Sequence, residues 1–301
     1  MKIKKHNSLY QKSEAKAGIL LSMPFFILFA LFTVVPVISS VVISFTDFDM
    51  VKMPSFVGME NYARLFLNDS VFMLAVGNTF VLAIILGPLS YILSFAFAWL
   101  INETSRSIRT FLTFCFYAPS ISGNMVAIWQ IFFSGDSHGY LNSIIYRLGI
   151  SNSPTLWLKN PDTILTVVCI VSLWASLGTS FLTFIAGLQG VDRSYYEASA
   201  IDGIKNRWQE LWFITLPLMK PQLLFGAVMS ISSSFGVGAL ITALCGYPTV
   251  NYSAHTIMNH LSDYAGMRFE VGYASAIATI LFIIMISINK IVQSLLNKVG
   301  G

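Results

Sequence analysis

Charged residues are scarce in this chain. Only 11% of its 301 residues are Asp, Glu, Lys or Arg, whereas 55% are hydrophobic and 14% are aromatic. A soluble globular domain carries about 25% charged residues, and a disordered chain is rich in charge and poor in aromatic side chains. The composition therefore excludes both classes and indicates a protein that lies in a membrane.

Cysteine and phosphate-binding patterns are equally limited. The three cysteines, Cys115, Cys169 and Cys245, lie in or at the edge of apolar runs. They cannot make a secreted disulfide framework, and no Cys/His spacing typical of a metal site is present. We interpret them as small apolar residues and expect no metal site. Neither GxxxxGKS nor GxxxxGKT occurs, so the chain cannot cradle ATP in that way.

Six apolar runs are long enough to cross a bilayer, which needs about 20 mostly apolar residues in a helix. They cover residues 17–45, 71–101, 111–133, 164–186, 222–245 and 271–289, and none contains a charged residue. We predict an all-α polytopic membrane protein with six transmembrane helices. Its membrane domain covers residues 17–301 and follows an N-terminal segment, residues 1–16. The first run is too long for a signal-peptide core, so it is interpreted as a retained span.

Basic residues indicate the orientation of these spans. With the N-terminus in the cytoplasm, thirteen of the 18 Lys and Arg residues fall in cytoplasmic segments and five in outer loops. Cytoplasmic loops of membrane proteins carry this excess of positive charge. We therefore expect a multi-pass protein of the cytoplasmic membrane, with both termini and the loop 187–221 inside. Orientation also explains the net charge of +4, so no nucleic-acid partner is expected.

The runs lack the residues that catalysis or ion coupling requires. Charged side chains inside a membrane are the usual mark of proton or ion coupling, and none is present. No Ser/His/Asp order and no paired carboxylates indicate catalysis, so we predict no catalytic residues. His255 and His260 share an outer loop, but two histidines without a third ligand more often reflect surface polarity than a zinc site.

The loop 187–221 begins with a helix-start pattern. Ser194 and Glu197 have the spacing of a capping box, in which each side chain satisfies a free backbone donor of the other residue. The pattern predicts a helix over residues 195–202. Gly203 then supplies a residue that adopts positive φ and ends the helix.

A second short helix is predicted after this glycine. Asn206 with Gln209 three residues later can start it, and we expect it to end before Leu216 and Pro217. Two-turn helices are marginal alone in water and need packing. Two interpretations follow from the residues alone: the loop packs on its own membrane bundle, with Glu197 as a cap, or it presents an interface to another protein.

A family resemblance bears on that choice. The loop contains Glu197-Ala198-Ser199-Ala200-Ile201-Asp202-Gly203 followed by Ile214-Thr215-Leu216-Pro217, and it resembles the EAA loop of ABC importer permeases. The wider stretch from Tyr195 to Pro221, with Arg207-Trp208-Gln209, is similar to the carbohydrate-uptake branch. Further similarity covers Phe56-Val57-Gly58-x-Glu60-Asn61-Tyr62, Gly139-x-x-Asn142 with Leu148-Gly149, and Gly272-Tyr273-Ala274-Ser275-Ala276. Two departures are Ser199 in place of the usual Ala and one extra residue before the Ile-x-Leu-Pro segment.

The resemblance implies a type I ABC importer permease, similar to the first permease subunit of maltose or glycerol-phosphate systems. It implies four kinds of partner: a second permease subunit, two ATP-binding cassette subunits that carry ATP and Mg, an extracellular or periplasmic solute-binding protein, and a sugar or oligosaccharide substrate. This chain would hold no cofactor and would not be an enzyme. The residues it implies for contact with the ATPase are Tyr196, Glu197, Ala198, Ser199, Ala200, Asp202, Gly203, Arg207 and Trp208. The alternatives are a secondary transporter or channel subunit without an ATPase partner, and a membrane enzyme.

Polar residues inside the runs are candidates for the solute pathway, because a neutral sugar needs uncharged donors and acceptors. Ser172, Ser176 and Thr179 follow helical spacing and should share one face. The other candidates are Ser230, Ser233 and Ser234 in the fifth run and Asn124 and Gln130 in the third. In the similar permeases, the corresponding parts of the fourth and fifth spans contribute to substrate contact. The alternative is that these side chains bond to their own helices or to neighbouring spans.

Overall fold

The computed structural model describes residues 2–122 and 125–299. In this part of the chain the regular structure is helical, apart from one isolated antiparallel bridge between Thr46 and Phe56. The all-α expectation is therefore confirmed. The chain divides into two compact units: one runs up to Leu65 and includes Tyr264–Ile280, and the other comprises Phe66–Asp263 and the chain from Leu281 onward.

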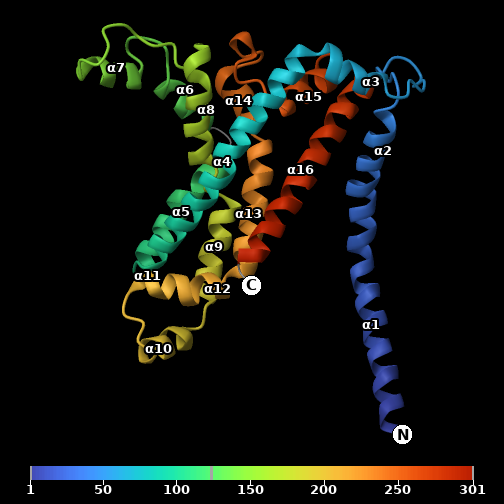
Figure 1. Ribbon diagram of the computed structural model, residues 1–301, viewed down its shortest axis with the longest axis vertical. Helices are drawn as coiled ribbons and strands as arrows, with labels where there is room; N and C mark the ends of the chain where they lie inside the picture. Colours follow the sequence, from blue (N-terminus) through green and yellow to red (C-terminus); the bar gives the residue numbers. More distant parts are fainter. Residues whose placement is uncertain (1, 123–124, 300–301) are drawn as a thin grey trace. The chain divides into compact units, whose positions relative to one another are not determined.

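The first unit begins with one long helix. Helix α1 (Lys2–Phe29), a π-helical turn η1 (Ala30–Val34) and α2 (Val35–Ile43) follow one another without a break (Figure 1). The wide turn precedes Pro36, the second residue of α2, whose ring nitrogen cannot donate a hydrogen bond. From Lys16 to Ile43 this helix is long and apolar enough to cross a membrane. Its most apolar window has no buried residue, which is the pattern of a lipid-facing span.

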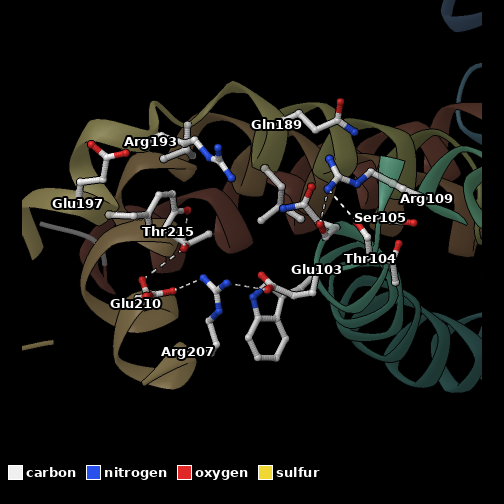
Figure 2. Close-up of a pocket in the computed structure, with 15 residues that line it drawn as sticks. Glu103, Thr104, Ser105, Arg109, Gln189, Arg193, Glu197, Arg207, Glu210 and Thr215 are labelled. Atoms are coloured by element: carbon white, nitrogen blue, oxygen red, sulfur yellow. Dashed lines mark hydrogen bonds and ion pairs between the residues drawn. The ribbon is translucent and has the colours of Figure 1, made fainter. Parts of the chain in front are cut away.

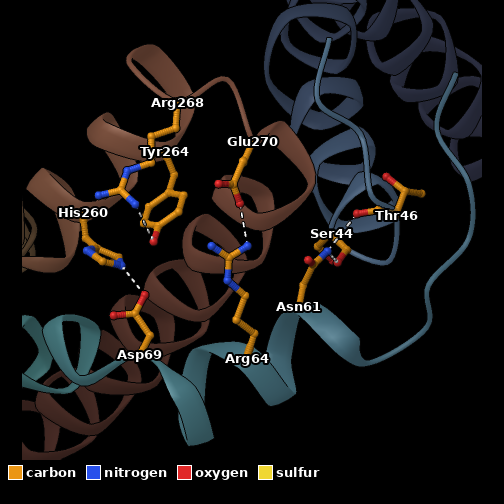
Figure 3. Close-up of polar contacts among 9 residues, drawn as sticks. All are labelled: Ser44, Thr46, Asn61, Arg64, Asp69, His260, Tyr264, Arg268 and Glu270. Atoms are coloured by element: carbon orange, nitrogen blue, oxygen red, sulfur yellow. Dashed lines mark hydrogen bonds and ion pairs between the residues drawn. The ribbon is translucent and has the colours of Figure 1, made fainter. Parts of the chain in front are cut away.

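Short polar contacts fix the loop that follows α2. Helix α3 (Glu60–Ala63) carries Asn61, whose Nδ2 donates to the carbonyls of Ser44 at 2.9 Å and Thr46 at 2.8 Å (Figure 3). The Ser44 hydroxyl lies 2.7 Å from the Tyr62 hydroxyl. The motif around residues 56–62 thus has a local structural role.

Arg64 fixes the same segment to the start of α16 (Val271–Val299). It begins a π-helical turn η2 (Arg64–Asn68), and its Nη1 lies 2.5 Å from Glu270 Oε2 (Figure 3). The guanidinium carbon also stands 4.2 Å from the centre of the Tyr273 ring, a favourable cation–π distance. Partial burial opposes the charge, but the hydrogen bond and the negative charge of Glu270, with smaller contributions from Tyr264 and Tyr273, together outweigh it, so the pKa of Arg64 is raised.

The second unit is built around α4, a helix of 33 residues (Ser70–Asn102). It packs along α9 (Thr179–Gly190) and α13 (Lys220–Phe235), which also contact each other. The remaining helices are α5 (Arg106–Ile121), α6 (Met125–Phe132), α7 (Tyr140–Arg147), α8 (Pro161–Ala175), α10 (Arg193–Ile201), α11 (Arg207–Glu210), α12 (Leu216–Leu218), α14 (Gly238–Cys245) and α15 (Ile257–Gly266), with the turns η3 (Leu211–Thr215) and η4 (Val250–Tyr252). Helices α10, α11 and α12 lie at one end of the unit, and α7 and α14 lie at the other (Figure 1).

Phe184 is the centre of the core that joins α4, α9 and α13. Its side chain is fully buried, and its ring meets those of Tyr91 and Phe95 edge to face at 5.5 and 5.6 Å. On the opposite side lies Gly226 of α13. A Cβ added at Gly226 would stand 2.5 Å from Phe184 Cε1, so only glycine fits there without displacing the ring.

Replacing Gly226 by alanine should therefore destabilise the protein, although alanine favours helices. We expect the overpacked ring to cost about 1–3 kcal/mol of unfolding free energy, seen as a lower thermal unfolding temperature in detergent or nanodiscs. Gly77→Ala is the matched control, because no atom lies within 4 Å of a Cβ at that site in α4. Adding Phe184→Leu to Gly226→Ala should restore part of the loss. Equal unfolding temperatures for the two alanine variants would contradict the packing argument.

The two histidines of the last outer loop are buried. His255 and His260 are only 1% and 2% exposed, and their rings are joined by a 3.1 Å contact from Nε2 to Nδ1. His260 Nε2 also lies 3.0 Å from Asp69 Oδ2, at the start of α4 (Figure 3). The expectation of surface polarity is wrong, because the pair lies in a buried network that joins distant parts of the chain. No group of three or more candidate ligands suited to a metal occurs in the described residues.

Spans can now be counted from the helices. In the described part of the chain, four helices are long and apolar enough to cross a membrane: Lys16–Ile43, Ser70–Asn102, Pro161–Gly190 and Val271–Leu295. Two bent pairs raise the number to as many as six, with bends of 86° between α5 and α6 and 81° between the segments Arg207–Leu218 and Lys220–Phe235. The structure thus has four to six candidate spans, and the count of six remains a prediction.

Candidate functional site

A small cavity lies among the helices of the second unit. It has a volume of about 190 Å³ and is lined by Ser90 of α4, Ser172 and Ser176 at the end of α8, and Ser233 and Ser234 of α13. The rest of its lining is apolar or glycine, with Leu86, Ala175, Gly236, Val237 and Leu240. Its wall therefore carries hydroxyl groups and no charge.

The cavity forms where two helices are interrupted. Helix α8 ends at Ala175 and α9 starts at Thr179; likewise α13 ends at Phe235 and α14 starts at Gly238. Gly178 has φ −123° and ψ −119°, outside the helical region. Non-helical backbone at membrane depth is tolerated only where protein or a cavity surrounds it, and broken helices of this kind form binding sites in transporters.

Most of the serine hydroxyls donate to their own helices. Ser176 Oγ donates to Leu173 O at 2.7 Å, and Ser233 Oγ donates to Ser230 O at 2.9 Å. Their oxygens keep lone pairs that can accept from a ligand. Ser172 differs, since its Oγ is buried and has no hydrogen-bond partner in the described part of the chain. Buried hydroxyls are normally paired, so Ser172 stands out as the one serine of the lining whose hydroxyl has no partner in the described residues.

Four of the five serines, Ser172, Ser176, Ser233 and Ser234, are among the residues predicted for the solute pathway, and that role stays a prediction. Ser90 was not among them. It is one hydroxyl in a long apolar run, and it donates to Gly87 O at 3.2 Å.

Other predicted pathway residues lie elsewhere. Thr179 does not share a helical face with Ser172 and Ser176; that prediction is wrong because the helix is interrupted between Ala175 and Thr179. Ser230 lies 3.3 Å from the Ser180 hydroxyl between α13 and α9. Gln130 donates to Ala243 O at 2.7 Å and lines a separate cavity, and Asn124 lies outside the described residues.

A second candidate site lies in the loop after α9. Helix α10 starts at Arg193, and its cap is Asp192, whose side chain accepts from Ser194 N at 2.9 Å. Hydrogen bonds from Ser194 lower the pKa of the Asp192 carboxyl. The predicted capping box of Ser194 and Glu197 is therefore wrong, because a carboxylate two residues earlier takes the cap. Gly203 has φ +96°, so its predicted turn is confirmed.

The second half of the loop follows the predicted start but not the predicted end. Asn206 Oδ1 accepts from Gln209 N, and Gln209 Oε1 accepts from Lys205 N, both at 2.9 Å. Asn206 therefore caps the start of α11 as expected. The helix does not stop before Leu216, because the π-helical turn Leu211–Thr215 accommodates Pro217 and the chain stays helical to Leu218.

An open cleft of about 920 Å³ lies between this loop and the end of α4 (Figure 2). Its charged lining residues are Glu103, Arg109, Arg193, Glu197, Arg207 and Glu210. Arg207 joins two of the carboxylates: its Nη2 lies 3.2 Å from Glu103 Oε2 and its Nη1 lies 2.6 Å from Glu210 Oε2. The hydrogen bond to Glu210 raises the pKa of Arg207.

The residues predicted for an ATPase contact are mostly exposed. Glu197, Ala198, Ala200, Asp202, Gly203, Arg207 and Trp208 are exposed, Tyr196 is half-buried, and Ser199 is buried. Large apolar side chains lie among them, with Ile201 88% and Trp208 63% exposed. Tyr196 is positioned by its own chain, because its hydroxyl lies 3.0 Å from Thr215 Oγ1.

Glu197 has no structural task in the loop. Its side chain makes no hydrogen bond or ion pair within the described residues, and it points away from the bridge formed by Arg207 (Figure 2). The interpretation of Glu197 as a cap is excluded by Asp192. An exposed carboxylate on a helix with small neighbours is available to a partner.

Comparison with known proteins finds a matching family and similar curated proteins. Residues 93–299 match the family described as binding-protein-dependent transport system inner membrane component. The chain is 32% identical over 292 residues to the probable ABC transporter permease protein YesP of Bacillus subtilis, covering 94% of this chain and 90% of the relative. It is 29% identical to the arabinooligosaccharides transport system permease protein AraP of the same organism, covering 96% and 91%.

A solved structure has the same fold. It is a chain of a bacterial alginate ABC transporter in complex with an alginate pentasaccharide-bound periplasmic protein. The TM-score is 0.77 at 21% identity, and the match covers 96% of this chain and 97% of that one.

Proposed function

The chain belongs to the family of binding-protein-dependent transport system inner membrane components, and from this we propose that it is one permease subunit of an ATP-driven importer for a sugar or oligosaccharide. A second permease subunit completes the pathway, two ATP-binding cassette subunits hold ATP and Mg and perform the hydrolysis, and a solute-binding protein outside the membrane delivers the substrate. The relatives named as ABC permeases, one of them for arabinooligosaccharides, support this assignment.

The proposal gives the chain six spans and a defined orientation. The permease domain covers residues 17–301 and follows a cytoplasmic segment, residues 1–16. Both termini and the loop 187–221 face the cytoplasm, which the thirteen-to-five distribution of basic residues supports. In this proposal α5 with α6 makes the third span, and α13 with α14 makes the fifth.

The observation that carries the substrate class is the uncharged serine cavity. A neutral sugar presents many hydroxyls, and the serine hydroxyls around the helix breaks can accept or donate to them. Charged side chains within the membrane are the usual mark of proton or ion coupling, and the lining of this cavity has none. The importer is therefore favoured over a secondary transporter or channel subunit without an ATPase.

In the same proposal, α10 and α11 are the coupling helices that dock on the ATPase. Glu197, Ala198 and Ala200 form the exposed, small-residue part of that surface. Closure of the ATPase pair on ATP would displace these helices and switch the bundle between outward-open and inward-open states.

Isolation of the complete complex tests this proposal. A tagged form of the chain, expressed with its genomic neighbours, should co-purify with a P-loop ATPase and a second permease. Proteoliposomes that contain the complex should take up sugar only when ATP and the loaded binding protein are both present, and vanadate should stop uptake. Sugar uptake by the chain alone, or uptake driven by an ion gradient without ATP, would contradict the proposal.

A further inference from the structure

Helix α4 is the element that belongs to both candidate sites. Ser90 lines the serine cavity, and Trp99 and Glu103, the last residues of the helix and its cap, line the loop cleft. The nine residues from Ser90 to Trp99 correspond to about 14 Å along a helix that rises 1.5 Å per residue. A helix is stiff over that distance, so a displacement of its end also displaces Ser90 at the cavity.

A pair of tryptophans joins the end of α4 to the loop. The rings of Trp99 and Trp208 have centroids 5.1 Å apart and planes inclined at 53°. Aromatic pairs at 4.5–7 Å attract each other beyond the area that they bury. Trp208 is the second residue of α11, so this contact holds the second coupling helix against α4.

Arg207, the neighbour of Trp208, adds a polar contact between the same two elements. Its guanidinium reaches Glu103 after α4 at 3.2 Å and Glu210 of its own helix at 2.6 Å (Figure 2). The planar guanidinium fixes the direction of both contacts. Exposed ion pairs add little stability, and the side chain of Arg207 is 63% exposed. The bridge therefore contributes more to the position of α11 beside α4 than to the stability of the fold.

The connection continues from α11 to α10. Thr215 Oγ1 lies 3.2 Å from Glu210 O and 3.0 Å from the hydroxyl of Tyr196 on α10 (Figure 2). Side-chain contacts therefore lead from the helix that carries Glu197, through Thr215 and α11, to the end of α4.

We propose that the Trp99–Trp208 contact and the Arg207–Glu103 bridge form the tie that passes movement of the coupling helices to α4, and through α4 to the serine cavity. Trp99, Glu103, Arg207 and Trp208 are then positioning residues of the transport cycle. This inference rests on the proposed function. It assigns to α4 the transmission of movement from a loop that is more than a hundred residues away in the sequence.

The test uses the complete transporter in proteoliposomes and measures ATP hydrolysis and sugar uptake together. Trp99→Leu and Trp208→Leu should each assemble with the ATPase and hydrolyse ATP, but the sugar imported per ATP should fall about tenfold, as expected for a typical coupling free energy. The double variant should be no worse than either single variant, because both remove the same contact. Glu103→Gln, a milder change, should lower the same ratio by about two- to fivefold.

Trp212→Leu is the matched control. Trp212 is on the same segment and is 65% exposed, but its ring makes no aromatic contact within the described residues. Its variant should keep the wild-type ratio of sugar to ATP.

Two outcomes would overturn the tie and leave the proposed function intact: an unchanged ratio in assembled Trp99→Leu complexes, or loss of ATPase binding in Glu103→Gln. A wild-type chain that binds no ATPase would overturn both.

Discussion

Reversing the charge at Glu197 is expected to abolish sugar uptake by detaching the ATPase. The carboxylate is exposed on α10 and has no partner within the described part of its own chain. A lysine at this position would place a positive charge opposite the hydrogen-bond donor with which the ATPase binds the carboxylate. Losing one partner of a buried, hydrogen-bonded charge pair costs about 2–5 kcal/mol, and 3 kcal/mol corresponds to about a hundredfold in affinity.

The fold should survive this substitution, which separates docking from folding. Asp192, not Glu197, caps α10, so Glu197→Lys removes no intramolecular contact. Binding of the ATPase to detergent-solubilised permease complex should weaken about a hundredfold for Glu197→Lys and less for Glu197→Gln, with unchanged thermal unfolding.

The control is the same charge reversal at the other end of the unit. Asp162 is exposed in the first turn of α8, away from α10 (Figure 1). Asp162→Lys should leave ATPase affinity unchanged. If Glu197→Lys kept full affinity and full uptake, α10 would not be the docking element.

The loop shows where prediction from sequence succeeds and where it fails. The turn at Gly203 and the Asn206–Gln209 pair depend on residues a few positions apart, and the structure has both. The cap of α10 was missed because two suitable residues, Asp192 and Ser194, compete for one helix start. A carboxylate at this position also interacts favourably with the positive end of the helix dipole. The capping-box pattern does not take this interaction into account.

Contacts between distant segments could not be predicted. Asp69 and His260 are separated by 191 positions, and each alone is consistent with an exposed loop. Only the packing of α15 against the start of α4 decides that both are buried. The contact between Trp99 and Trp208 has the same origin, since no local pattern in either segment specifies the other.

The serine cavity is an intermediate case for prediction from sequence. Hydroxyl content singled out parts of the fourth and fifth runs whose serines line one cavity, but helical spacing suggested one continuous face through Thr179. Gly178 and Gly236 mark the interruptions. A glycine inside an apolar run is compatible with a straight helix as well as with a break, so spacing alone could not distinguish the two.

Filling that cavity should stop transport without unfolding the protein. Ser172→Leu would place a branched apolar side chain into a space of about 190 Å³ that is bordered by hydroxyls. The Ser172 hydroxyl has no hydrogen-bond partner in the described part of the chain, so its removal breaks no contact within the protein. We expect uptake to fall at least tenfold, because a ligand hydroxyl that loses its partner in a buried site costs about 1–3 kcal/mol, and the leucine also excludes the ligand by volume.

Two alanine variants divide the effect into its parts. Ser172→Ala removes the hydroxyl but leaves space, and it should lower uptake less than Ser172→Leu. Ser233→Ala removes a hydroxyl that donates to Ser230 O at 2.9 Å and should change the relative rates among a panel of mono- and oligosaccharides. Each variant should assemble with the ATPase and the second permease.

ATP hydrolysis separates a blocked pathway from a broken complex. The assembled Ser172→Leu transporter should still hydrolyse ATP when the loaded binding protein is present, because the cavity lies apart from the loop that we propose docks on the ATPase. Uptake at the wild-type rate in Ser172→Leu, with an unchanged order of sugars in both alanine variants, would show that the solute passes elsewhere. The serines would then serve only to hold the interrupted helices together, since hydroxyls inside membrane bundles also bond neighbouring spans.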